Sequence, residues 1–162
     1  MNRLVLIGRV PALLLLGGGL WLHAQRVMPP TGKHTVYIHH GAAVQTPPAS
    51  LADGFRVASE SIFRNAPSAL LQGMTTDLES RIRQSGLVVE IIYKKPPAVE
   101  NTQTARSTPL IDRLMIPLDG QYVGWVLYGI GHYSSGPLLV PDKRALNPLR
   151  DLILPPANLP RS

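Results

Sequence analysis

The 162-residue chain contains no cysteine. It can therefore form no disulfide framework, and it offers neither a thiolate nucleophile nor a thiolate ligand for a metal ion. The stability of a folded domain has to come from packing instead. An apolar content of 44% is sufficient for a real core.

The sequence also lacks the usual motifs for nucleotides and nucleic acids. Its glycine-rich stretches at 17–19 and 129–131 have neither the Gly-x-Gly-x-x-Gly spacing nor the Lys-Ser/Thr pair of a phosphate-binding loop. There is no block of Lys and Arg, and no basic stripe interleaved with aromatic residues. We therefore expect no cofactor and no nucleic-acid partner.

Acidic residues are few, with ten Asp and Glu against sixteen Lys and Arg, and the formal net charge is +6. After Ala24 the counts are 14 basic and 10 acidic residues, which leaves a charge of +4. A charge of this size favours solubility and would also assist association with anionic lipid head groups or polyanionic envelope polymers.

The most informative feature that is present is an apolar run from Leu4 to Leu22, in which Arg9 is the single charge. A run of this length directs a chain to a membrane, either as a cleaved secretory signal or as an uncleaved anchor. Both place the remaining residues outside the cytoplasm. We therefore predict an extracytoplasmic protein that is either membrane-anchored or periplasmic or secreted.

Two interpretations of residues 1–24 stay open. In a signal peptide, the basic region ends at Arg9, Val10–Leu22 is the hydrophobic core, and cleavage follows Ala24. In an anchor, residues 4–22 contact the membrane as a spanning helix, and Arg9 has to reach the cytoplasmic face because a guanidinium is costly at the centre of a bilayer.

Proline-rich and polar segments divide the rest of the chain. Residues 25–33, which include a Pro-Pro pair, are expected to form a tether. Residues 34–153 are expected to form one small domain, and residues 154–162 an irregular tail. Within the domain, residues 95–109 are rich in Pro, Thr, Gln and Asn, which is typical of an exposed loop.

Two amphipathic helices are predicted in the first half of the domain. The first begins with Ser50 as its N-cap and Asp53 as a capping-box partner, and runs to Ile62. The second has apolar residues at helical spacing, opposite charges four residues apart and a terminating Gly86. Its apolar positions are Leu71, Met74, Leu78 and Ile82, and its expected ion pairs are Asp77–Arg81 and Glu79–Arg83.

Residues 34–40 and 87–94 are predicted to form strands. Alternation along the second strand places Val89 and Ile91 on the core face and Glu90 on the other. Apolar neighbours of Glu90 on that other face indicate that it is partly covered as well.

A two-residue type I′ hairpin turn is predicted at Asp119-Gly120, which separates two β-prone runs. The corresponding register pairs Leu114 with Trp125 and places both on one face of the ribbon. Pro117 has no N–H to donate to a neighbouring strand, so its strand is expected at a sheet edge.

The end of the domain predicts three further elements. Residues 129–137 form a glycine-rich loop, residues 138–140 form a last strand, and residues 143–153 form a short helix weakened by Pro148. The predicted fold class is therefore α+β, with two helices packed on one face of a mainly antiparallel sheet of three to five strands.

The strongest candidate for a binding or catalytic site is the loop Gly131–Gly136. It combines an imidazole, a phenol and two hydroxyls among glycines, supplied by His132, Tyr133, Ser134 and Ser135. His132, Ser134 and Ser135 are the catalytic candidates. A turn that follows a strand explains the same residues, and no acidic residue close in sequence would orient His132.

Three histidines near the start of the domain are weak metal candidates. Along an extended strand, His34 and His40 share one face and His39 lies on the other. A metal site would need further ligands from distant positions, so surface histidines are the favoured interpretation.

The function that best fits this sequence is a non-catalytic envelope protein, tethered or exported, that binds another protein or supports an assembly. The alternative is a small extracytoplasmic hydrolase or ligand-binding enzyme centred on Gly131–Gly136. The carboxylates of Asp77 and Glu79 already have helical arginine partners, which argues against their use in acid–base catalysis. Whether the chain is an enzyme is left open, with the non-catalytic interpretation favoured.

Overall fold

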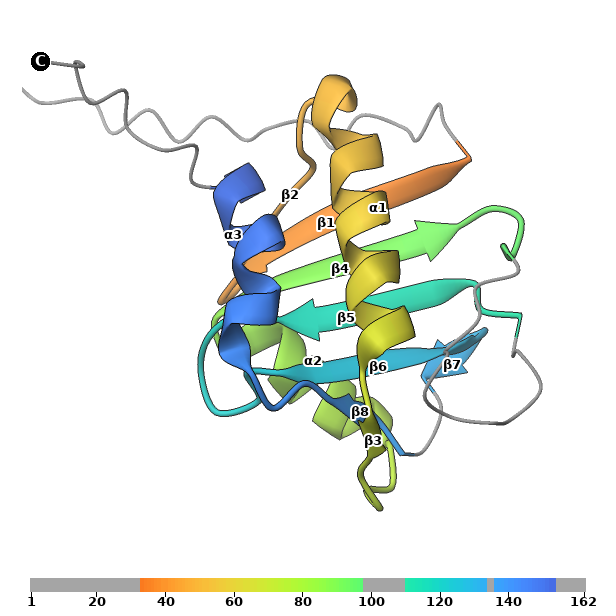
Figure 1. The fold of residues 1–162 in the computed structure, drawn as a ribbon, viewed down its shortest axis with the longest axis vertical. Helices are drawn as coiled ribbons and strands as arrows, with labels where there is room; N and C mark the ends of the chain where they lie inside the picture. Colours follow the sequence, from red (N-terminus) through yellow and green to blue (C-terminus); the bar gives the residue numbers. More distant parts are fainter. Residues whose placement is uncertain (1–32, 98–109, 134–135, 154–162) are drawn as a thin grey trace, which may run out of the picture.

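The structure is a computed structural model of residues 1–162, and it describes residues 33–97, 110–133 and 136–153 (Figure 1). The expected signal or anchor, the tether before Lys33 and the tail from Leu154 lie outside the described residues. Among the residues that it describes, no helix has the length and apolar character needed to cross a bilayer.

The centre of the domain is an antiparallel β-sheet. Its strands are β1 (His34–His40), β2 (Ala43–Gln45), β3 (Ser68–Ala69), β4 (Leu87–Tyr93), β5 (Arg113–Pro117), β6 (Trp125–Ile130), β7 (His132–Tyr133) and β8 (Leu138–Leu139). Their order is β2-β1-β4-β5-β6-β8-β3, with β7 paired to β6. The expected antiparallel sheet is confirmed, but three to five strands was too few, because strands of two or three residues have almost no periodic signal.

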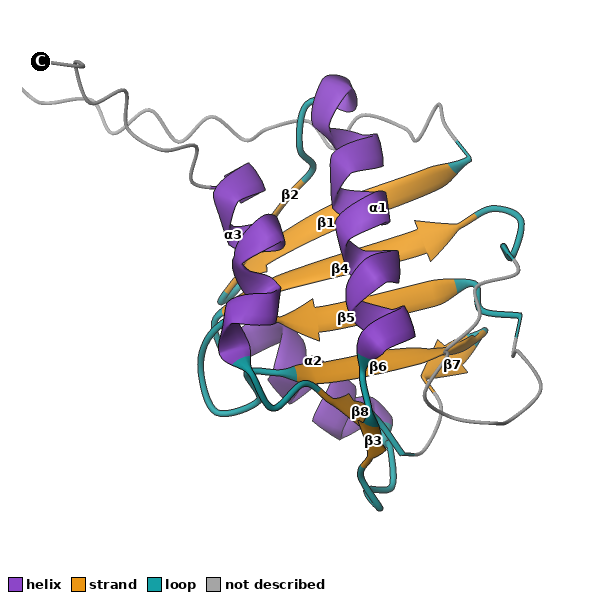
Figure 2. Ribbon diagram, viewed as in Figure 1, coloured by secondary structure: helices purple, strands orange, loops and turns teal. Residues whose placement is uncertain are grey.

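Three α-helices cover the sheet within the described residues (Figure 2). They are α1 (Ala49–Asn65), α2 (Thr76–Gln84) and α3 (Asn147–Ile153), the last preceded by a 3-10 turn at Lys143–Leu146. Helices α1 and α3 lie on one face of the sheet and α2 lies on the other (Figure 1). The expectation that the helices share one face of the sheet is therefore wrong. The expected number of helices, two, is also wrong.

Both faces of the central strands are buried, and this explains why helices are needed on each side. On β4, Val89 and Ile91 belong to the larger core under α1 and α3, whereas Val88 belongs to a smaller core with Ile82 of α2. Glu90 shares the α2 face with Val88, and that face is covered as the alternation indicated.

The first helix differs from the prediction at its N-terminus. Helix α1 begins at Ala49, its N-cap is Pro48, and no side chain caps it, so Ser50 does not have the expected role. The first backbone hydrogen bond is donated by the Leu51 N–H to the Pro48 carbonyl, at 2.9 Å. Ser50 therefore lies within the helix.

The second helix is shorter than predicted. Helix α2 begins at Thr76, where the Thr75 hydroxyl accepts a hydrogen bond from the Leu78 N–H at 3.1 Å, and Leu71 is fully exposed. Strand β3 (Ser68–Ala69) pairs with β8, and the Gln72 carbonyl accepts a hydrogen bond from the Gly136 N–H at 3.0 Å. Contacts with the distant segment 136–139 therefore hold the chain before Thr76 outside the helix, despite its helical periodicity. Both predicted ion pairs are present, at 3.2 Å for Asp77–Arg81 and 3.8 Å for Glu79–Arg83.

The predicted hairpin is wrong in turn type and register. Leu114 pairs with Tyr128 instead of Trp125, and the connection between β5 and β6 runs over residues 118–124. Trp125 is consequently partly buried against the smaller core on the α2 face, opposite Leu114. Only Gly120 has a positive φ at the expected turn, at 72°, whereas a type I′ turn needs two such residues.

The reason for the longer connection is a tertiary contact. A carboxylate oxygen of Asp119 accepts a hydrogen bond from the Leu87 N–H at 2.6 Å, which fixes the connection to the start of β4. A Cβ at Gly120 would lie 2.6 Å from the Ser85 carbonyl oxygen, so glycine is required there for space as well as for φ.

Pro117 does not mark a sheet edge, because β5 lies between β4 and β6. Pro117 is the last residue of β5, and its carbonyl accepts from the Gly124 N–H at 3.4 Å, just before β6 begins. A missing donor is tolerated at that end of the ladder. The predicted final strand and helix are confirmed, and Pro148 is the second residue of α3, in the first turn where proline is accepted.

Candidate functional site

Among the described residues, the densest group of hydrogen-bonded polar side chains surrounds Glu90, which is only 5% exposed. His39 Nε2 lies 2.8 Å from Oε2, and Arg83 donates through Nε at 3.0 Å to Oε2 and through Nη2 at 2.8 Å to Oε1. The hydroxyl of Tyr133 donates to Oε1 at 2.7 Å. One carboxylate therefore connects β1, α2, β4 and β7.

The surroundings of Glu90 keep it ionised. Burial acts to raise the pKa of its carboxyl, but the hydrogen bonds from His39, Arg83 and Tyr133 outweigh burial and lower the pKa from 4.5 to about 2. Burial and the adjacent carboxylate raise the pKa of the Tyr133 phenol well above its usual value. The guanidinium carbons of Arg83 and Arg113 each lie 5.7 Å from the centroid of the Tyr133 ring.

This arrangement limits the chemistry available to Glu90. An ionised carboxylate has about four acceptor positions, and four donor atoms from His39, Arg83 and Tyr133 already occupy them. With its pKa lowered to about 2, the group does not act as a general acid near neutral pH. The geometry is that of a buried structural connection.

A second buried carboxylate lies on the opposite face of the sheet. Glu60 of α1 accepts a hydrogen bond from the Tyr93 hydroxyl at 3.1 Å and is paired with Arg56 at 3.2 Å and Arg64 at 3.7 Å. Burial, followed by the charge of Glu60, raises the pKa of Tyr93. As at Glu90, the carboxylate accepts a hydrogen bond from a protonated phenol and is paired with guanidinium groups.

The structure describes only part of the predicted loop site. Tyr133 is buried and binds Glu90, while His132 is exposed. Ser134 and Ser135 lie outside the described residues, so the predicted combination with His132 is untested. The fold does bring an acidic residue to this loop, because Asp112 Oδ2 accepts a hydrogen bond from the Gly131 N–H at 2.9 Å.

Asp112 is already engaged by its neighbours. Arg113 Nε donates to its other carboxylate oxygen at 2.8 Å. Burial acts to raise the pKa of Asp112, but the hydrogen bonds from Arg113 and Gly131 and the nearby His132 lower it overall. Across residues 33–97, 110–133 and 136–153, no hydrogen bond joins His132 to a carboxylate.

His34 and His39 of β1 face opposite sides of the sheet, as the alternation predicted. His34 Nε2 contacts the Ala52 carbonyl at 3.2 Å, His39 binds Glu90, and His40 is exposed at the end of the strand. Within the described part of the chain, no three His, Asp or Glu side chains are grouped so as to hold a metal ion.

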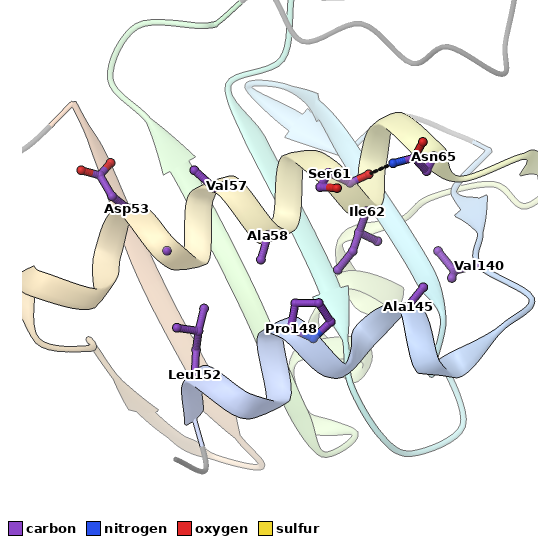
Figure 3. Close-up of a pocket in the computed structure, with 11 residues that line it drawn as sticks. Asp53, Val57, Ala58, Ser61, Ile62, Asn65, Val140, Ala145, Pro148 and Leu152 are labelled. Atoms are coloured by element: carbon purple, nitrogen blue, oxygen red, sulfur yellow. Dashed lines mark hydrogen bonds between the residues drawn. The ribbon is translucent and has the colours of Figure 1, made fainter. Parts of the chain in front are cut away.

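A groove of about 770 Å³ lies between α1 and α3 (Figure 3). Its walls are mainly apolar and are made by Val57, Ala58, Ile62, Val140, Ala145, Pro148 and Leu152. Asp53, Ser61 and Asn65 border it; Asp53 is paired with Arg56 at 3.2 Å, and the Asn65 amide donates to the Ser61 carbonyl at 2.8 Å. Val57, which lines the groove, is 55% exposed.

Comparison with known proteins adds no assignment, because no family model, curated protein or solved structure matches this chain. Its properties therefore have to be argued from its own geometry.

Sequence reasoning missed the Glu90 cluster, since it assigned Arg83 to Glu79 and left Glu90 on a partly covered face. The available signal was a single charged residue within the apolar run Leu-Val-Val-Glu-Ile-Ile-Tyr. A charge inside such a strand requires buried partners, and His39 on the preceding strand was one candidate.

Proposed function

We propose that this chain is a non-catalytic, extracytoplasmic envelope protein, membrane-tethered or exported, that binds an apolar segment of another envelope protein in the α1–α3 groove. The groove is the observation that supports this proposal. Its mainly apolar walls suit an apolar side-chain surface.

The state of the buried ionisable groups supports a non-catalytic role. Glu90 and Glu60 are both enclosed and hydrogen-bonded by side chains of this domain. A catalytic carboxylate needs access to substrate and a pKa suited to proton transfer. The extracytoplasmic location rests on the apolar run at residues 4–22.

The test is site-specific photocrosslinking in the intact envelope. A photoreactive amino acid replaces Val57 in the groove of the full-length chain, and the matched control replaces Ser80, which is exposed on α2 across the sheet. We expect an adduct with one envelope protein from position 57 and none from position 80.

The protein identified in this way is then purified for binding measurements. Because Val57 is half-exposed, Val57→Asp should leave the fold intact while placing a charge in the apolar groove. We expect affinity to fall at least tenfold with Val57→Asp and to stay unchanged with Ser80→Asp. Equal adducts at both positions, or unchanged affinity with Val57→Asp, would contradict the proposal.

A further inference from the structure

The α1–α3 groove has different charges beside its two ends. Figure 3 shows Asp53 and Leu152 at one end and Asn65 and Ala145 at the other. We propose that the partner segment is an amphipathic helix that lies in the groove antiparallel to α1, with an acidic residue near its N-terminus and a basic residue near its C-terminus. This inference names the kind of partner for the same groove, so it rests on the proposed function.

The walls of the groove favour a helix over an extended segment. They are made mainly by α1 and α3, whose backbone N–H and C=O groups are hydrogen-bonded along the helix axes. Of the described lining residues outside these helices, Val140 donates its N–H to the Gly124 carbonyl at 2.8 Å, and Ala145 donates to the Asp142 carbonyl at 3.1 Å. An extended segment would therefore bury backbone groups without partners, which is costly. A helix satisfies its own backbone.

The length of the groove suits a short helix. From Gly54 to Asn65, α1 advances about 17 Å at about 1.5 Å per residue, which corresponds to about three helical turns. An apolar stripe with helical spacing on the partner would then contact Val57, Ile62 and Pro148 along the groove.

Acidic side chains lie at the end of the groove marked by Leu152. Asp53 lines this end, and its side chain is 80% exposed, because Arg56 pairs with only one of its carboxylate oxygens, at 3.2 Å. Asp151 precedes Leu152 on α3 and is exposed. A basic residue of the partner is therefore favoured at this end.

Basic side chains lie at the opposite end. Arg144 directly precedes Ala145 and is exposed, and Arg64, which is paired with Glu60 at 3.7 Å, directly precedes Asn65. Asp142 is also near Arg144, but one of its oxygens accepts the Arg144 N–H at 2.9 Å and so caps the 3-10 turn. An acidic residue of the partner is favoured at this end.

These charges determine the direction of the partner helix. Helices are stabilised by acidic residues in the first turn and basic residues in the last, because of the helix dipole. Such a helix matches both ends of the groove only if it begins beside Arg144 and ends beside Asp53. It then runs antiparallel to α1, so its dipole also opposes that of the longer of the two groove helices.

Three synthetic peptides of about 15 residues test this inference, because shorter isolated helices are marginally stable. All carry the same stripe of leucines. The first has Glu in its first turn and Lys in its last, the second has these charges exchanged, and the third is the first with a proline at its centre, which breaks the helix. Binding to the full-length chain in nanodiscs of zwitterionic lipid is measured by fluorescence anisotropy, with empty nanodiscs as the blank.

We expect the first peptide to bind more tightly than either of the others, by about fivefold or more. Equal affinities of the first and second peptides would overturn the inferred direction. An equally tight third peptide, or no binding of any peptide, would overturn the helical partner.

Exchanging the charges of the groove provides the matched variant. Asp53→Lys with Arg144→Glu should reverse the preference, so that the second peptide binds more tightly than the first. The control, Asp77→Lys with Arg81→Glu, makes the same exchange between two exposed side chains of α2 across the sheet and should keep the original preference. Circular dichroism checks that both variants are folded. An unchanged preference in the groove variant would contradict the inference.

The adduct formed at position 57 separates this inference from the proposed function. Mass spectrometry of that adduct identifies the partner segment, which should carry an apolar helical stripe between an acidic N-terminal and a basic C-terminal residue. If Val57→Asp weakens partner binding but the segment lacks this pattern, the inference fails and the proposed function stands. If the peptides behave as expected but position 57 gives no adduct in the envelope, the proposed function fails.

Discussion

Replacing Glu90 by glutamine tests the buried cluster most directly. The change keeps the shape of the side chain and removes the charge that His39 and Arg83 face. The folded-state pKa of Glu90 is about 2 against an ordinary 4.5. One pKa unit corresponds to about 1.4 kcal/mol, so the ionised carboxylate contributes about 3 kcal/mol to the free energy of unfolding at neutral pH.

The pH dependence has a definite sign. Because the folded-state pKa is lowered, the contribution of Glu90 is complete above about pH 4.5 and is lost as the pH falls towards 2. Glu90→Gln has no such contribution at any pH. The difference in stability between the two proteins should therefore be about 3 kcal/mol at pH 7 and should shrink below pH 4.5.

Urea denaturation followed by far-UV circular dichroism, repeated between pH 7 and pH 3, measures this difference. The matched control is Asp77→Asn, because the Asp77 side chain is 81% exposed in its pair with Arg81, and such pairs contribute about 0–1 kcal/mol. A loss below about 1 kcal/mol for Glu90→Gln, or a difference that does not change with pH, would refute the reasoning.

Three further outcomes are expected. Gly120→Val should lower the free energy of unfolding by more than about 2 kcal/mol in the same assay, since a β-branched residue resists positive φ and its Cβ would lie 2.6 Å from the Ser85 carbonyl oxygen. Gly73→Ala, with open space around it, should cost less than about 0.5 kcal/mol. Ser134→Ala combined with Ser135→Ala should leave the biological role intact in a complementation assay; loss of the role with normal folding and export would favour the hydrolase alternative. A reporter that functions only outside the cytoplasm should be active when fused after Ser162, and activity of a cytoplasm-only reporter there would contradict the predicted location.

The elements predicted correctly are those whose signal is local. Strand β4, strand β1 and the ion pairs of α2 follow from alternation and from charges four residues apart. These patterns involve residues within a few positions of one another, so the sequence alone was sufficient. The α+β fold class could be predicted for the same reason.

The errors occur where distant contacts decide the outcome. Asp119 and Gly120 have the composition of a tight hairpin, but the hydrogen bond from Leu87, 32 residues away, supports a longer connection. The Glu90 cluster similarly joins His39 and Tyr133, which are 51 and 43 residues away from it. No periodic pattern encodes such pairings.

The Glu90 cluster also determines how β1 can align with β4. His39 is paired with Val88 in the ladder, and its side chain reaches Glu90 on the same face. A shift of one residue would move His39 to the other face and leave Glu90 without one of its buried donors. Misaligned pairings of these two strands are therefore penalised by an uncompensated charge as well as by lost packing, so a single-residue insertion within β1 should be tolerated much less well than one in the connection before α1.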